Sequence, residues 1–296
     1  MKMKKHRIRL RVQLAVTALS NGYIQGFIGG KIYNGGLKRL CVPGLSCYSC
    51  PGALGSCPIG SLQAVMSSSG SDLPFYVIGF LILFGAVLGK LACGWLCPFG
   101  LVQDLIHKIP FCAKRKKLPG DKVLVFFKYA VLVIAVVMLP IFVTNRFGIG
   151  TPTFCKYLCP SGMLMGGIPL YLLNAGIRSA AGFLFTYKFL VLLVIVVLSL
   201  WVYRPFCRYL CPLGAIYGLF NKVSLISYQI DKSKCTDCGL CKKTCKLDIN
   251  VKNNPNHALC IRCGACKRAC PADAISFVCL NKKLRQSCKS DNRPEK

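Results

Sequence analysis

Two copies of one cysteine pattern near the C-terminus limit what this chain can fold into more than any other feature. Both copies have the spacing C-x2-C-x2-C-x3-C, and the second ends in Cys-Pro. Three closely spaced thiolates can bind three corners of a 4Fe–4S cubane, and the fourth ligand then comes from the other copy. The pattern therefore predicts two 4Fe–4S clusters. One would be held by Cys235, Cys238, Cys241 and Cys270, and the other by Cys260, Cys263, Cys266 and Cys245.

Two other uses of these cysteines fit the pattern less well. Structural zinc prefers two pairs of cysteines, or cysteines with histidines, rather than two complete runs of four. A disulfide framework is disfavoured because the chain has 21 cysteines, an odd number, and because the runs are too crowded for separate bridges. Iron–sulfur ligation is the favoured interpretation.

The rest of the chain is too apolar for an ordinary soluble domain. Of its 296 residues, 54% are hydrophobic, and the formal charge of +30 lies in blocks between apolar segments. Segments 74–92, 123–143 and 183–203 each approach the ~20 residues that cross a bilayer. A weaker fourth segment, 12–32, follows a basic flank and is interpreted as an uncleaved signal anchor. Lysines near the ends of the first three segments are expected to snorkel toward water; they are Lys90, Lys128 and Lys188.

The distribution of positive charge predicts an orientation in the membrane. Residues 1–11 carry six Lys or Arg, the 93–122 connection carries six, and the part after Tyr203 carries eighteen. The 33–73 and 145–182 connections carry only two and three. The positive-inside rule then places both termini and the 93–122 connection in the cytoplasm. This arrangement needs four spans, and it explains the high net charge without a nucleic-acid partner.

A second set of cysteines follows the apolar segments. The sequences CGWLCPFG at 93–100, CKYLCPSG at 155–162 and CRYLCPLG at 207–214 are close repeats. Cysteines four residues apart on a helix face one side, and the following proline ends the helix. Two such motifs could therefore supply four ligands. The topology predicts a possible inner membrane cluster held by Cys93, Cys97, Cys207 and Cys211.

An outer cluster is the corresponding hypothesis for the other face of the membrane. It would join Cys155 and Cys159 to two ligands from the group Cys41, Cys47, Cys50 and Cys57. The sequence leaves that choice open. Disulfides within the 41–57 group are an alternative, because the outer compartment can be oxidising. The isolated cysteines are expected only to pack as small apolar side chains; they are Cys112, Cys279 and Cys288.

At these motifs the chain resembles the membrane-bound polyferredoxins of the NapH and NosR type. The stretches that carry the resemblance are CGWLCPFGLVQDL, CRYLCPLGAIYGL and the two C-terminal runs. The resemblance implies a bacterial inner-membrane protein that passes electrons between a quinol or cytosolic donor and redox protein partners. The chain departs from the NosR type because it has no room for a large extracytoplasmic flavin-binding domain. Its 41–58 segment and its third C-x3-C-P motif also exceed the simpler NapH pattern.

These observations predict a polytopic α-helical membrane domain of about four spans at 1–226. A small α+β bacterial-type 2[4Fe-4S] ferredoxin domain follows at 227–278, and a basic tail occupies 279–296. The predicted function is membrane-bound electron transfer through two to four 4Fe–4S clusters. No haem, dinucleotide or P-loop motif supports an enzyme with its own small-molecule substrate. The alternatives are a metal-reducing or maturation factor for a partner metalloenzyme, and a redox sensor.

Overall fold

The computed structural model describes residues 2–67, 75–110, 114–143 and 150–279. Cys112, Cys288 and all but the first residue of the predicted tail lie outside these ranges. The α-helices are α1 (Lys2–Ser20), α2 (Ile24–Gly29), α3 (Pro58–Met66), α4 (Phe75–Leu88), α5 (Leu91–Trp95), α6 (Pro98–Ile106), α7 (Asp121–Val131), α8 (Leu139–Phe142), α9 (Pro160–Gly162), α10 (Ile168–Leu173), α11 (Ala175–Ser179), α12 (Phe183–Trp201), α13 (Pro205–Tyr209), α14 (Pro212–Phe220), α15 (Leu240–Thr244) and α16 (Ala265–Ala269). The remaining elements are the 3-10 helix η1 (Gly36–Arg39), the π-helices η2 (Leu132–Met138), η3 (Phe154–Leu158) and η4 (Met163–Gly167), and the strands β1 (Ile226–Ile230) and β2 (Ile275–Cys279).

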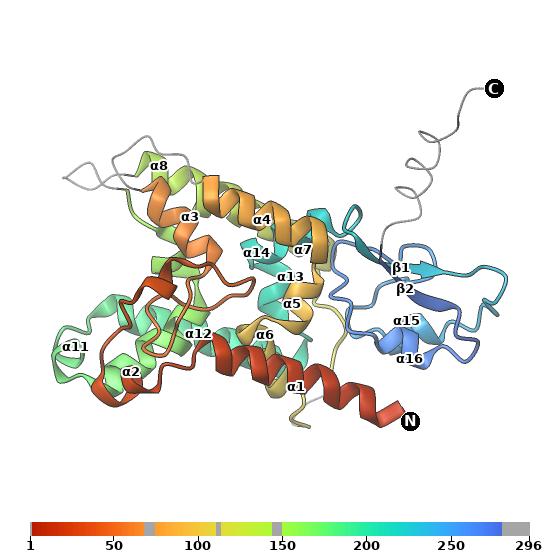
Figure 1. Ribbon diagram of the computed structural model, residues 1–296, viewed down its shortest axis with the longest axis horizontal. Coiled ribbons are helices and arrows are strands. Elements are labelled where there is room, and N and C mark those ends of the chain that lie inside the picture. The colour runs from red at the N-terminus through yellow and green to blue at the C-terminus, as the bar shows by residue number, and fades with distance from the viewer. Residues whose placement is uncertain (1, 68–74, 111–113, 144–149, 280–296) are drawn as a thin grey trace.

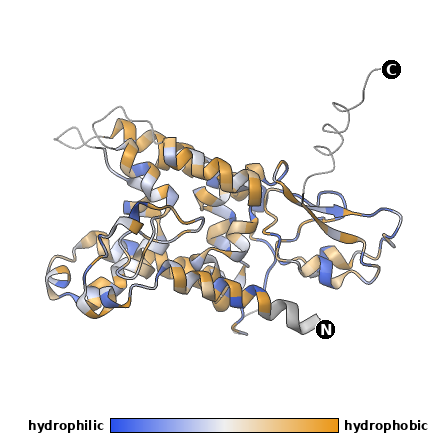
Figure 2. Ribbon diagram, in the orientation of Figure 1, coloured by the Kyte–Doolittle hydropathy of each residue, from blue (hydrophilic) through white to orange (hydrophobic). Residues whose placement is uncertain are grey.

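The longer helices lie along the long axis of the molecule. The two-stranded sheet and the start of α1 lie at one end, whereas α2 and α11 lie at the other (Figure 1). Hydrophobic residues predominate in α4, α7, α8 and α12 (Figure 2). Many large apolar side chains on these helices point outward, and Phe75, Val123, Phe142 and Phe183 are each more than 70% exposed. Such a continuous apolar exterior needs an apolar environment to cover it.

Among the residues that the structure describes, two helical stretches are long and apolar enough to cross a membrane. They are Asp121–Phe142, formed by α7, η2 and α8, and Phe183–Trp201, which is α12. The helix in the predicted segment 74–92 is shorter, because α4 ends at Leu88. The predicted segment 12–32 does not form one helix. There α1 ends at Ser20, and the side chains of Ser20 and Asn21 donate to the carbonyl oxygen of Thr17. These bonds compete with continuation of the helix.

Prolines set the positions of the three π-helices. Pro140, Pro160 and Pro169 each follow the end of a π-helix by two residues. Proline has no N–H to donate, and its ring clashes with the carbonyl group one turn earlier, so the preceding turn widens. The second of these widened turns carries Cys155, so a proline effect on the backbone helps to place a candidate ligand.

The C-terminal part repeats one backbone conformation. Strands β1 and β2 pair antiparallel, with Ile226 opposite Cys279 and Ile230 opposite Ile275. Between them, each cysteine run has positive φ angles at three equivalent positions. These positions are Asp237, Gly239 and Asp248 in the first run, and Arg262, Gly264 and Asp273 in the second. Left-handed residues between right-handed ones turn successive N–H groups toward one point and create an anion-binding concavity. The sequence repeat is therefore also a structural repeat.

The C-terminal part packs directly against the helical part. An added Cβ at Gly94 on α5 would lie only 2.2 Å from the carbonyl oxygen of Ile261. The Trp95 Nε1 donates to the carbonyl oxygen of Arg262 at 3.1 Å, and the Arg262 guanidinium donates to Leu88 and Asn221 carbonyl oxygens at 2.9 and 2.8 Å. The turn that carries Cys93 is therefore in contact with the loop between Cys260 and Cys263.

Replacing Gly94 should weaken this contact. In Gly94→Val the new side chain meets the Ile261 carbonyl group, so we expect a loss of about 2 kcal/mol or more of docking stability. Limited proteolysis should then cleave the chain between the two parts faster than in the wild type. Gly79→Ala is the matched control, because nothing lies within 4 Å of a Cβ added there. Equal proteolysis rates for Gly94→Val and the wild type would contradict the prediction.

Candidate functional site

The first predicted set of ferredoxin ligands surrounds one cavity. Cys235, Cys238 and Cys241 line a cavity of about 220 Å³ together with Cys270 from the other run. The left-handed residues Asp237 and Gly239 belong to its wall. A donor set of four thiols, with backbone N–H groups turned inward, suits an anionic iron–sulfur cluster. The geometry therefore supports an arrangement in which three ligands come from the first run and the fourth, Cys270, comes from the second run. The ligand assignment itself stays a prediction.

The second predicted set also converges. Cys245, Cys260 and Cys263 pack against one apolar cluster formed by Tyr203, Leu247, Ile249, Leu259 and Ile261. Burial raises the pKa of Cys260 to about 12, and the nearby thiols of Cys263 and Cys245 add to this shift. Burial likewise raises the pKa of Cys266 to about 12, with Cys260 next in effect. Metal binding would replace the protons that these buried thiols retain.

The inner motifs share one local geometry. Cys93 and Cys207 lie in the short helices α5 and α13, which end before the second cysteine of each motif. Cys97 and Cys211 then stand in extended conformation before Pro98 and Pro212, which begin α6 and α14. Each accepts a hydrogen bond at Sγ from a backbone N–H, namely from Gly100 at 3.4 Å and from Gly214 at 3.3 Å.

The four inner cysteines lie together in the core of the molecule. All are at least 92% buried, and the rings of Phe99 and Phe206 join the two motifs edge to face at 5.3 Å. Burial, followed by the neighbouring thiols of Cys97 and Cys207, raises the pKa of Cys93 to about 12. The Gln103 Nε2 donates to the Cys207 Sγ at 3.2 Å. The predicted inner ligands are therefore brought together.

A carboxylate and two arginines hold the inner motif in place. The Arg204 guanidinium donates to Asp104 at 2.7 Å and to the carbonyl oxygen of Cys93 at 2.6 Å. Arg9 on α1 also pairs with Asp104 and donates to the carbonyl oxygen of Gly94 at 3.0 Å. Burial would raise the pKa of Asp104, but Arg204 and Arg9 outweigh it and lower that pKa to about 2. Asp104 is therefore ionised at neutral pH.

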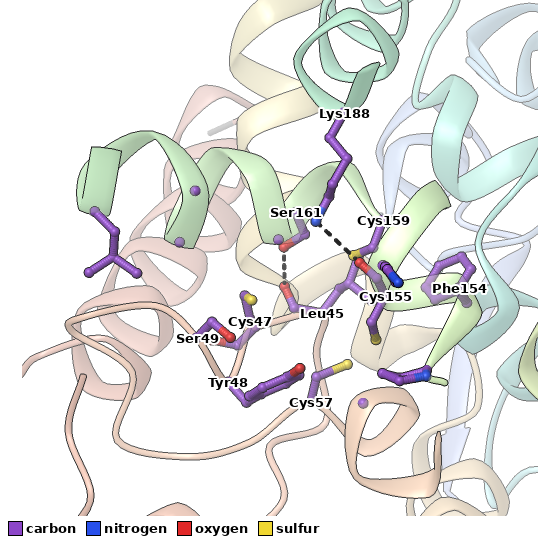
Figure 3. A pocket seen from close by; sticks show the side chains of 18 residues that line it. Leu45, Cys47, Tyr48, Ser49, Cys57, Phe154, Cys155, Cys159, Ser161 and Lys188 are labelled. Atoms are coloured by element: carbon purple, nitrogen blue, oxygen red, sulfur yellow. Dashed lines mark hydrogen bonds between the residues drawn. The ribbon is translucent and has the colours of Figure 1, made fainter. Parts of the chain in front are cut away.

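The outer site is a cavity of about 330 Å³. Cys47 and Cys57 reach it from the loop before α3, and Cys155 and Cys159 reach it from η3 and the turn before α9 (Figure 3). The Lys188 side chain extends into the same space from α12 and donates to the carbonyl oxygen of Cys155 at 3.3 Å (Figure 3). Four thiols and one ammonium group are a donor set suited to an anionic cluster.

The other two cysteines of the 41–57 group do not line this cavity. The Cys41 Sγ lies 3.9 Å from the hydroxyl oxygens of Ser56 and Ser61, and Cys50 is buried elsewhere in the loop. Every cysteine of the group is a free thiol. Within the described ranges, no three His, Cys, Asp or Glu side chains converge closely enough to hold a single metal ion. Cys279, expected to pack inside, is instead exposed on β2 because its register position is at the end of the sheet.

The backbone of one residue, Leu45, connects the inner and outer sites. The N–H of Leu45 donates to the Cys97 Sγ at 3.4 Å, while the carbonyl oxygen of Leu45 accepts from the Ser161 hydroxyl at 3.3 Å. Ser161 and Leu45 both line the outer cavity. Gly44 permits this approach, because a Cβ there would lie 3.0 Å from the Cys97 Cα. The 41–57 loop thus extends into the core rather than covering its surface.

Sequence reasoning missed several residues that surround these sites. Lys90 and Lys128 do not snorkel, because both are at least 99% buried. Asp104 was not singled out either, although it lies in the stretch CGWLCPFGLVQDL and is one of only nine acidic residues. An acidic side chain close to a cysteine motif, in a chain with so few acidic residues, was the signal that could have identified it. Asp121 is a second such residue, because its carboxylate pairs at 2.7 Å with Arg208, the neighbour of Cys207.

Removing the charge of Asp104 should loosen the inner motif. Its folded pKa of about 2 lies below the ordinary value of 3.8, so its stabilising effect is complete above that value and is lost as the pH falls toward 2. At neutral pH, Asp104→Asn leaves two buried arginines poorly paired, which should cost about 3 kcal/mol or more. We expect a lower midpoint of thermal unfolding.

Asp231→Asn is the control for that measurement. Asp231 pairs with Lys234 at 3.9 Å, and both side chains are exposed. Exposed ion pairs contribute at most about 1 kcal/mol, so this variant should unfold near the wild-type temperature. If the two variants had the same midpoint, the proposed role of the Asp104 network would be wrong.

Comparison with known proteins agrees with the iron–sulfur interpretation. The 4Fe-4S binding domain family matches residues 72–119, 129–169 and 185–228, and a second 4Fe-4S binding domain family matches residues 255–276. The first family covers all three C-x3-C-P motifs. No solved structure was found to match the chain.

Three relatives illustrate the similarity. An uncharacterized protein of Methanocaldococcus jannaschii is 30% identical over 209 residues, which are 69% of this chain and 78% of the relative. The ferredoxin-type protein NapH of Haemophilus influenzae is 30% identical over 184 residues, 60% of this chain and 54% of NapH. The putative electron transport protein YccM of Escherichia coli is 24% identical over 187 residues, 59% of this chain and 46% of YccM.

These matches confirm the resemblance drawn from the cysteine motifs and support 4Fe–4S clusters as the cofactors. The relatives include ferredoxin-type and electron transport proteins, which supports iron–sulfur electron transfer with redox partners. Together with the two apolar helices, the family matches and the shared motifs lead to one conclusion. The chain belongs to the membrane-associated 4Fe–4S polyferredoxins.

Proposed function

We propose that this protein relays electrons between a cytosolic or quinol donor and a redox partner at the membrane or beyond it. In this proposal residues 1–226 form a multi-pass domain of four spans in a bacterial cytoplasmic membrane. Residues 227–278 form a ferredoxin domain in the cytoplasm, where both termini also lie. Bound 4Fe–4S clusters would supply the chemistry, which is the storage and transfer of single electrons.

The observation that carries the proposal is the unbroken succession of cysteine sites. The ferredoxin loop at Cys260–Cys263 contacts the turn of Cys93 through Gly94 and Trp95. Leu45 then links Cys97 to the outer cavity. The sites therefore follow one another through the molecule and are joined by backbone contacts.

The direction of the helices supports the proposed topology. Arg9 in the first half of α1 lies beside the inner motif, and Leu88 at the end of α4 lies beside the ferredoxin loop. In α7, Asp121 lies at that same end, where it pairs with Arg208. In α12, Lys188 near the start contacts the outer site, whereas the carbonyl oxygen of Ser199 near the end lies 3.0 Å from the His107 Nδ1 on the inner side. Helices α1 and α7 thus run outward, and α4 and α12 run inward.

The proposed ligands of the sites follow from the cavities and motifs. The ferredoxin domain would hold two clusters through the two exchanged sets of four cysteines. The inner membrane site would use Cys93, Cys97, Cys207 and Cys211. Of the alternatives left open for the outer site, the cavity favours Cys47 and Cys57 as partners of Cys155 and Cys159. Cys41 and Cys50 would then have no ligand role.

The first test concerns the inner site. Cys93→Ala and Cys207→Ala should each remove about four iron and four sulfide per chain, because each destroys the same four-thiolate set. EPR spectra of the reduced, anaerobically purified protein should lose the same signal in both variants. Cys279→Ala on β2 is the control and should retain it. Loss of different signals in the two variants would break the proposed pairing, and unchanged iron in both would remove the inner cluster.

The second test concerns the outer site. Cys57→Ala should lower the iron content by about four per chain, because it removes one of the four thiols that line the outer cavity. Cys41→Ala is a matched control from the same loop, because Cys41 is also buried but does not line the cavity, and its Sγ lies 3.9 Å from two serine hydroxyl oxygens. If Cys41→Ala lost iron and Cys57→Ala retained it, the ligand set proposed for this cavity would be wrong.

A further inference from the structure

Two lysines that the sequence places at membrane boundaries lie inside the protein. Lys90 follows the end of α4, and its side chain is 1% exposed. Lys128 lies in the last turn of α7 and is fully buried. Helix α7 packs against α13 and α14, and the charges of both lysines interact with the thiols of Cys93 and Cys211. A pair of buried cations of this kind is unfavourable unless negative charge lies nearby.

The protein around these lysines offers them few polar partners. The Lys90 Nζ donates to the carbonyl oxygen of Ala258 at 3.0 Å. The Lys128 Nζ has no hydrogen-bond partner among the described residues and lies 5.0 Å from the centre of the Tyr129 ring. An ammonium group can donate three hydrogen bonds. Lys128 therefore has an unsatisfied ammonium group inside the protein.

No carboxylate in the described part of the chain balances the two charges. The aspartates that form ion pairs there, such as Asp104 and Asp121, pair with other cations. The groups of opposite sign that face the lysines are cysteine thiolates, once these are deprotonated. For Lys90 they belong to Cys93, Cys207 and Cys211 of the inner motifs and to Cys260 of the ferredoxin loop, and for Lys128 to Cys93 and Cys211.

We propose that Lys90 and Lys128 are the buried counter-charge of the inner four-cysteine site and raise its reduction potential. The inference rests on the proposed function, because it requires an iron–sulfur group at that site. A cubane with four thiolate ligands is anionic and becomes more so on reduction, so a nearby cation favours the reduced form. Lys90 and Lys128 would act on the inner site through their charge and would not be ligands.

Burial makes these two cations more effective than the numerous surface lysines. Charges in water are screened within about 10 Å at moderate ionic strength, whereas buried charges are screened far less. Lys252, beside the ferredoxin cavity, is about half exposed and pairs with Asp237. The potential of the inner site should therefore depend on Lys90 and Lys128 more strongly than that of the ferredoxin cavity depends on its surrounding lysines.

The test is an EPR-monitored redox titration of the full-length, anaerobically purified protein. The inner signal is first identified as the one that disappears in Cys93→Ala. In Lys128→Met and in Lys90→Met, its midpoint should shift to lower potential. Lys128→Arg should restore the wild-type midpoint, because it keeps the charge. Lys122→Met is the control, since Lys122 lies in the same helix but is exposed, and its inner midpoint should not move.

Each further outcome decides the proposal. An inner signal that keeps the wild-type midpoint in both methionine variants overturns it. If Lys128→Met loses the signal, a lowered midpoint in Lys90→Met still supports it. Loss of the signal in both methionine variants overturns it, because the lysines would then serve assembly rather than potential. Failure of the proposed function is distinguishable, since Cys93→Ala would then leave the iron content and the spectrum unchanged.

Discussion

The close approach of the Gly94 backbone to the Ile261 carbonyl group is the contact on which the rest of the arrangement depends. It places the cysteine turn of α5 against the ferredoxin loop, and no side chain separates them. Arg262 strengthens this contact from one side through Leu88 and Asn221, and Trp95 does so from the other. The two parts of the chain therefore meet where cysteines are densest. A flexible connection between separate domains would not fix the distance between their cysteines.

Charge inside the molecule follows the cysteines. Arg204 contacts the carbonyl group of Cys93, Lys188 that of Cys155, and Lys128 faces the inner thiols. Where a carboxylate is available, as at Asp104, the cation forms an ordinary buried ion pair. Where none is available, as at Lys128, the proposed iron–sulfur group would supply the balancing negative charge.

Local patterns in the sequence predicted much of this structure. The spacing of the two cysteine runs predicted a paired module, and the structure adds the repeated left-handed residues at Asp237 and Arg262. The pairing of the 93 and 207 motifs also followed from their positions along the chain. The path of the 41–57 loop did not, because nothing local indicates that Leu45 reaches Cys97. For the same reason, choosing Cys47 and Cys57 over Cys41 and Cys50 required the cavity. The snorkelling expected of Lys90 and Lys128 was wrong because it considers a lysine and the bilayer but not the packing of neighbouring helices, which buries both side chains.

The insertion of the 41–57 loop has a physical consequence in the proposed membrane domain. Irregular backbone is tolerated at membrane depth only where protein or an aqueous cavity covers it. Here the backbone of Leu45 satisfies both of its polar groups, the N–H with the Cys97 Sγ and the carbonyl oxygen with the Ser161 hydroxyl. The same two hydrogen bonds join the inner and outer cysteine sites. Because a buried backbone must find such partners, the stability of the loop and the continuity of the proposed electron path depend on the same atoms.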